Sequence, residues 1–87
     1  MGKPPKQRPN LSVRMVEGEA VVLDRVQGLV HQMNKTATFI WQRCDGSHSS
    51  KDIAEQLVAA FEVSPAEAEK NVTAAIAEIQ KLHLLES

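Results

Sequence analysis

The chain has 87 residues and a mass of 9.6 kDa, which fits one small domain and excludes a second. Hydrophobic residues make up 43% and charged residues 24%, a mix typical of folded globular proteins. The net charge of −1 supplies no broad positive field for non-specific nucleic-acid binding, and the single cysteine excludes an internal disulfide. No apolar run approaches the ~20 residues of a membrane helix or resembles a signal peptide, so we expect a cytoplasmic protein.

The first ten residues differ from the rest of the chain. They contain three of the four prolines, no acidic residue and the basic residues Lys3, Lys6 and Arg8. Proline fixes φ and removes a backbone donor, so this composition opposes regular structure. We predict a flexible basic N-terminal segment over 1–10 and a single domain over 11–87.

Three short strands are predicted next. From Leu11 apolar residues alternate with polar ones, which is the period-2 pattern of a half-buried strand over roughly 11–16. A β-branched run at 20–23 and an apolar run at 29–33 follow, and Gly28 between them suits a turn position with positive φ. Strands this short, joined by tight turns, predict an antiparallel meander.

A helical period begins after Asn34, a residue type that favours the N-cap position. Gly46 suits the left-handed position that follows a helix, so a first helix is predicted between these two residues. Its apolar positions recur at i, i+3, i+4 and i+7, namely Ala37, Ile40, Trp41 and Cys44.

Two further helices are predicted, over roughly 50–62 and 65–82. The N-cap of the first is Ser49 or Ser50. The second has an N-cap serine, a proline at N1 and a glutamate at N3 in the capping-box arrangement, in the run Ser64-Pro65-Ala66-Glu67. The fold class is therefore α+β, with a three-stranded antiparallel sheet followed by three helices.

The predicted sheet has two open edges, and each edge presents backbone N–H and C=O groups to a second chain. A peptide could use such an edge, and so could another copy of the protein. A homodimer through the strand that receives a peptide would compete with that peptide.

No enzyme motif is present, because the four glycines lie too far apart for a phosphate loop and neither a nucleophile elbow nor an HExxH spacing occurs. The possible metal ligands His31, Cys44, His48 and His83 match no usual ligand spacing. We predict a protein without catalytic residues, metal or cofactor. Cys44 and Trp41 are interpreted as core residues, and His31 as a polar residue at a strand edge.

Four short motifs are spread over the centre of the chain: His31-Gln32-Met33-Asn34-Lys35-Thr36-Ala37, Ile40-Trp41, Cys44-Asp45-Gly46 and Ile53-Ala54. They resemble the pattern of PqqD-like proteins, in which a strand ends in Leu-Asn, a helix carries Ile-Trp and Asp-Gly precedes the next helix. Leu82 and the run Leu84-Leu85-Glu86 are similar to the closing turn of that family. The resemblance covers about residues 11 to 86.

The resemblance implies a winged-helix-like peptide-binding module, also called a precursor peptide recognition element. Such modules capture the leader segment of a ribosomally made precursor peptide and present it, as peptide chaperones, to a modifying enzyme that is often of the radical SAM class. The leader adds as an extra strand beside the third strand, and its side chains enter the cleft between that strand and the third helix.

Carried over to this chain, the peptide-binding residues are Leu29, Val30, His31, Gln32 and Met33 on the strand and Asn71, Ala75, Glu78 and Leu82 on the helix. Replacing His31 by proline would then remove a strand donor and abolish peptide binding. The turn at 24–28 lacks the Pro-Glu-Gly of the PqqD protein of the quinone-cofactor pathway, which favours a relative that serves another pathway.

Two other classes of function remain open. A winged-helix DNA-binding or transcription-associated domain would need a basic recognition helix, but both long predicted helices carry more acids than bases. Only the basic segment over 1–10 supports it. A structural subunit held permanently on an enzyme would show an exposed apolar patch and co-purify with that enzyme.

Overall fold

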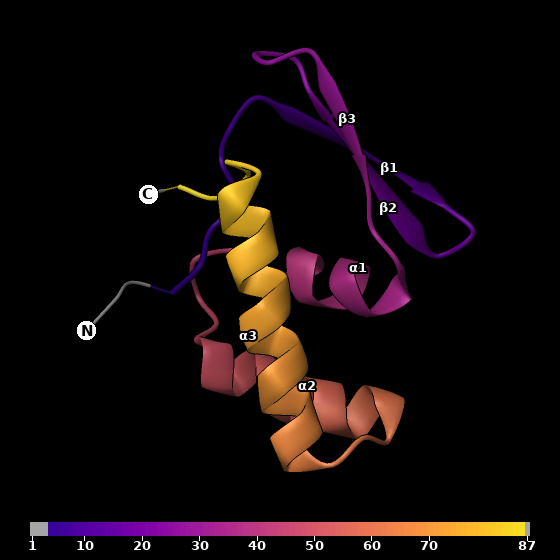
Figure 1. Cartoon of the computed structure of the whole chain (residues 1–87), viewed down its shortest axis with the longest axis vertical. Coiled ribbons are helices and arrows are strands. Elements are labelled where there is room, and N and C mark those ends of the chain that lie inside the picture. The colour runs from indigo at the N-terminus through magenta and orange to yellow at the C-terminus, as the bar shows by residue number, and fades with distance from the viewer. Residues whose placement is uncertain (1–3, 87) are drawn as a thin grey trace.

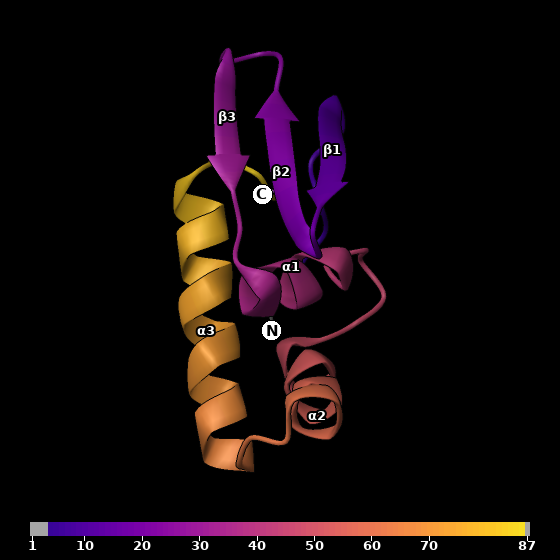
Figure 2. The ribbon, with the colours of Figure 1, turned by 90° about the vertical axis from the view of Figure 1, so that its right-hand side faces the viewer.

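The computed structural model describes residues 4–86 and contains three strands followed by three helices (Figure 1). The sheet projects from one end of the helical part of the molecule (Figure 2). This order confirms the predicted α+β fold. The elements are β1 (Leu11–Val16), β2 (Glu19–Asp24), β3 (Leu29–Gln32), α1 (Lys35–Gln42), α2 (Ser50–Phe61) and α3 (Pro65–Lys81).

The sheet is an antiparallel meander in the order β1-β2-β3. Glu17 and Gly18 turn the chain between β1 and β2 with φ of 52° and 81°, and Gly28 precedes β3 with φ of 70°. Alternate residues of β2 are fully buried and face the helices: Ala20, Val22 and Asp24. Both β1 and β3 are edge strands, as predicted.

Each helix begins at a predicted cap. Asn34 accepts a hydrogen bond from the backbone N–H of Ala37, and Ser64 accepts one from the N–H of Glu67. The reciprocal capping box occurs at Ser49 and Asp52, at the start of α2, whereas at α3 the forward bond alone is found among the described residues. Side-chain oxygens thus satisfy backbone donors that a helix start leaves without a partner.

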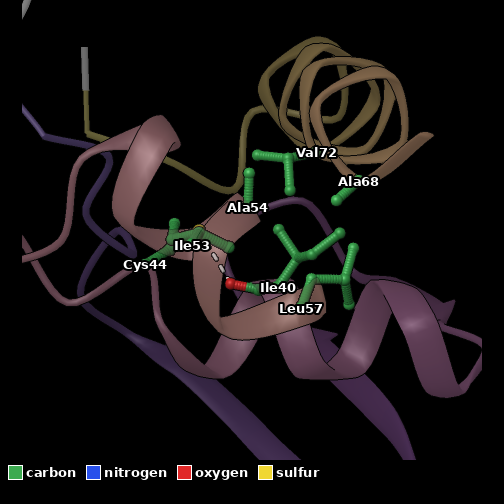
Figure 3. Packing of buried hydrophobic residues seen from close by; sticks show 7 residues of the cluster. All are labelled: Ile40, Cys44, Ile53, Ala54, Leu57, Ala68 and Val72. Atoms are coloured by element: carbon green, nitrogen blue, oxygen red, sulfur yellow. Dashed lines mark hydrogen bonds between the residues drawn. The ribbon is translucent and has the colours of Figure 1, made fainter. Parts of the chain in front are cut away.

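Two clusters of buried residues hold the molecule together. The first lies among the three helices (Figure 3) and contains Ile40, Cys44, Ile53, Ala54, Leu57, Ala68 and Val72. The second joins the sheet to the helices and contains Ala20, Val22, Met33, Trp41, Ile79 and Leu84. Trp41 and Cys44 are therefore core residues, as interpreted, and burial raises the pKa of the Cys44 thiol to about 11.

The N-terminal segment differs from the flexible stretch predicted over 1–10. Residues 1–3 lie outside the described residues, but residues 5–8 run between the loop after α1 and the C-terminal tail. The backbone N–H of Gln7 donates to Cys44 O and that of Arg8 donates to Leu84 O, at 2.8 and 3.0 Å. Proline at 5 and 9 does not prevent this pairing, because the residues between them keep their backbone donors.

Arg8 also joins the N-terminal segment to the sheet through Asp24. The Asp24 carboxylate has no exposed surface and accepts hydrogen bonds from Arg8, from the N–H groups of Val26 and Gln27, and from the Gln27 side chain. Burial disfavours the ionised form, but the Gln27 bonds and the Arg8 charge outweigh it and lower the pKa of Asp24 below its ordinary value.

A buried hydroxyl joins the sheet to α1. Thr38 is 3% exposed, and its Oγ1 accepts from the N–H of Ala20 at 2.8 Å and donates to the carbonyl of Met33 at 3.3 Å. The N–H of Met33 in turn donates to the carbonyl of Ala20. Thr38 therefore completes the last rung between β2 and the end of β3, where these strands meet the helices.

Replacing Thr38 by valine should lower the free energy of unfolding by about 1–3 kcal/mol, because it leaves a buried N–H and a weakly bonded carbonyl without their partner. Denaturant unfolding followed by circular dichroism measures the loss. The same exchange at the exposed Thr73 of α3 is the matched control and should stay within about 0.5 kcal/mol of the parent protein. Equal effects at the two positions would contradict this role of Thr38.

The Asp24→Asn variant should be less stable than the parent near neutral pH, where the folded protein holds the ionised carboxylate. Because the folded pKa lies below the unfolded one, this stabilisation is present above the ordinary value of 3.8 and is lost as the pH falls through the folded pKa. Urea unfolding across this range should show the two proteins converging in acid. Glu69→Gln, at an exposed position, serves as control. A difference in stability between Asp24→Asn and the parent that does not change with pH would contradict this role of the Asp24 carboxylate.

Candidate functional site

A groove of about 530 Å³ lies between the end of β3 and one face of α3, with the first turn of α1 between them. Figure 2 shows β3 and α3 along the same side of the molecule. The groove is lined by His31, Gln32, Met33, Asn34, Thr36, Ala37, Asn71, Ala74, Ala75, Glu78, Ile79 and Leu82. It therefore joins two segments that are about 40 residues apart in the sequence.

The groove contains all but two of the residues selected from the sequence. Leu29 and Val30 lie outside it, towards the tip of the hairpin, and are 46% and 63% exposed. The residues that sequence reasoning missed are Asn34, Thr36, Ala37, Ala74 and Ile79. Helical spacing could have found Ala74, because it lies three residues after Asn71 and four before Glu78. The first turn of α1 lines the groove because the chain enters this helix directly after β3.

Backbone groups of β3 point alternately towards β2 and away from it. The N–H of Met33 donates to Ala20 O, and the register pairs His31 with Val22 and Val30 with Leu23. In an antiparallel ladder this parity directs the backbone groups of residues 29, 31 and 33 to β2. The N–H and C=O groups of Val30 and Gln32 therefore face the open edge.

The alternation of inward and outward backbone groups shows that His31→Pro, the substitution suggested by the sequence, was the wrong choice. The N–H of His31 faces β2, so proline at this position would break the sheet and would not test an added strand. The His31 side chain lies on the same face as Val22, towards the helices, and lines the groove. Its Nε2 atom is buried and has no hydrogen-bond partner within the described chain. The donor or acceptor needed to satisfy it could come from a ligand.

The groove combines an apolar floor with a polar rim. Met33 and Ile79 are 6% and 3% exposed, and half-buried Ala75 and Leu82 extend the apolar surface. Among the lining residues that the structure describes, Glu78 alone carries a formal charge when histidine is neutral. Such a surface can bind an extended chain through shape, backbone hydrogen bonds and one carboxylate.

A metal-binding arrangement is not found among residues 4–86, where no group of three or more His, Cys, Asp or Glu side chains is placed to hold an ion. Nor does any helix in the described part of the chain combine the length and apolar character needed to cross a membrane. Cys44 lies in the cluster among the helices and does not line the groove.

Comparison with known proteins decides the family. The model for the family described as coenzyme PQQ synthesis protein D (PqqD) matches residues 19–85, which include both walls of the groove. The chain belongs to the PqqD family. No match was found among curated proteins.

Two solved structures resemble this PqqD family member over nearly its whole length. The first, described as lasso peptide synthetase B1 complexed with the leader peptide, is 30% identical and has a TM-score of 0.84. The comparison covers 97% of this chain and 99% of that chain. The second, described as TbiB1 in complex with the TbiA(beta) leader peptide, has the same TM-score at 17% identity and covers 94% and 95%. The second likeness shows the fold.

Proposed function

We propose that this protein is a non-catalytic module that binds the leader segment of a ribosomally made precursor peptide and presents it to a separate modifying enzyme. The observation that carries the proposal is the open edge of β3 beside a groove with an apolar floor. Family membership and the leader-peptide complex of a neighbour at 30% identity support the same conclusion.

The proposed mode of binding is addition of the leader as a fourth strand along β3. The outward backbone groups of Val30 and Gln32 would form main-chain hydrogen bonds with it, and these bonds are largely independent of the leader's sequence. Alternate leader side chains would point into the groove. The residues proposed to contact the peptide are Leu29, Val30, His31, Gln32, Met33, Asn71, Ala75, Glu78 and Leu82.

Selectivity would come from the groove, because its walls differ in character. The floor formed by Met33, Ala75 and Ile79 favours an apolar leader side chain, which would lose its water-exposed surface there. Glu78 at the rim favours a basic residue or a hydroxyl nearby. A like-charged residue at that point of the leader would be disfavoured.

The modifying enzyme is a separate protein in this proposal. The family resemblance favours a radical SAM enzyme, whereas the name of the neighbour at 30% identity favours the enzymes of a lasso peptide pathway. The proposed compartment is the cytoplasm, where ribosomally made peptides and a reduced thiol such as that of Cys44 occur together. This chain would supply binding and positioning, and its partner would supply the chemistry.

Replacing Val30 by proline should weaken binding of the leader peptide encoded beside this gene by about tenfold or more, because it removes an outward N–H and places a ring at the strand edge. The Val30→Ala variant keeps the N–H and is the matched control, with affinity expected within a few-fold of the parent. Fluorescence anisotropy with a labelled leader measures both.

Neither substitution removes a hydrogen bond to β2, so both variants should unfold within a few degrees of the parent protein. Parent-like affinity in folded Val30→Pro would overturn strand addition at β3. A random DNA duplex should not bind at physiological salt. Saturable DNA binding without peptide binding would favour a winged-helix DNA-binding domain and overturn the proposal as a whole.

A further inference from the structure

The groove extends past the end of β3. Figure 2 shows that α3 continues beyond this strand, alongside α1, and the groove follows α3 as far as Asn71. A leader that pairs with Val30 and Gln32 therefore leaves the sheet edge before it leaves the groove. Beyond β3 the carbonyl of Asn34 already accepts a hydrogen bond from the N–H of Thr38 in α1. The backbone groups of the leader need other partners there.

Asn71 lies in the middle of α3, on the face that lines the groove. Asparagine is a weak helix former, because its side chain competes with the backbone for hydrogen bonds. The side chain of Asn34 caps α1, whereas Asn71 is half-buried and its side-chain amide makes no hydrogen bond within residues 4–86. An amide at this position, without a partner in the described part of the chain, is available to a ligand.

We propose that the Asn71 amide binds the backbone of the leader peptide where the leader has passed the end of β3. This inference rests on the proposed function and adds a second point of main-chain recognition to it. A side-chain amide carries the same groups as a peptide unit, an N–H donor and a C=O acceptor. It can therefore accept from the N–H of one leader residue and donate to a nearby leader carbonyl, as β3 does at the sheet edge.

The neighbouring side chains of α3 favour Asn71 for this contact. The other polar side chain that this helix contributes to the groove is Glu78, whose carboxylate only accepts hydrogen bonds. Between these two residues the groove is lined by Ala74 and Ala75, whose small side chains let an extended backbone approach the helix. Because the contact involves the main chain, many leader residues fit there, but proline does not, since it has no N–H.

The distance from β3 fixes which leader residue Asn71 contacts. Met33 and Ile79 belong to the same buried cluster, so the end of β3 lies near Ile79. Asn71 precedes Ile79 by two turns of helix, which is about 12 Å along the axis. An extended chain spans this distance with about three or four residues. The contact therefore lies about three or four residues beyond the leader segment that pairs with β3.

Backbone ester substitution in the leader tests the proposal, because an ester in place of an amide removes one N–H and leaves the side chains unchanged. The leader peptide encoded beside this gene, with one ester at a time, is titrated against the parent protein and Asn71→Ala by fluorescence anisotropy. Asn71→Ala should weaken binding of the unmodified leader about three- to tenfold. One ester beyond the β3 segment should weaken binding to the parent, but change binding to Asn71→Ala by less than about twofold.

Two controls separate a binding role of Asn71 from a structural one. Thr73→Ala, at an exposed position of α3 outside the groove, should keep the parent affinity for every peptide. Asn71→Ala should have a Tm no lower than the parent, because alanine is the better helix former. A lower Tm would show that the amide supports the protein's own fold and would overturn the proposal. Parent-like affinity of Asn71→Ala, or equal ester effects in both proteins at every leader position, would also overturn it.

Esters opposite Val30 and Gln32 distinguish this proposal from the proposed function. They should weaken binding to the parent and to Asn71→Ala by the same factor. If they do so while no ester effect depends on Asn71, strand addition stands and the Asn71 contact is wrong. If no ester opposite β3 weakens binding, strand addition is wrong and the Asn71 contact fails with it.

Discussion

The hydrogen bonds between β2 and β3 determine which backbone groups of β3 are free to bind a second chain. One hydrogen bond, from the N–H of Met33 to the carbonyl of Ala20, decides which backbone groups of β3 face inward. The Thr38 hydroxyl completes that rung and joins it to α1. These bonds therefore set which backbone groups face the open edge and hold the end of β3 on α1.

The N-terminal segment and the C-terminal tail support this arrangement through the buried face of the sheet, where Asp24 and the cluster below β2 lie. Arg8 pairs with Asp24 at the end of β2 and also donates to the carbonyl of His83, just after α3. It therefore holds the end of β2 and the end of α3 together. Leu84, which is fully buried, adds the tail to the cluster beneath the sheet. The end of α3 that lines the groove is thus fixed relative to β3.

Much of this fold could be predicted from local patterns. The strand at 11–16 and the helix starts at Asn34 and Ser64 depend on residues that are close in the sequence, so the sequence alone predicts them. The groove residues on β3 and α3 followed from the family resemblance, and their meeting in one groove needed the tertiary structure. The hydrogen bonds that hold residues 5–8 could not be predicted from the sequence, because their partners, Cys44 and Leu84, are far along the chain. The register between β2 and β3 was needed to show that the N–H of Val30, and not that of His31, faces the open edge.

Hydrogen exchange of the protein with and without the leader peptide distinguishes strand addition at β3 from other modes of binding. Strand addition predicts alternate behaviour along β3: the amides of Val30 and Gln32 gain protection on binding, whereas that of His31 is already protected in the free protein and changes little. Uniform protection of the strand, or protection confined to α3, would show that the peptide binds without adding to the sheet.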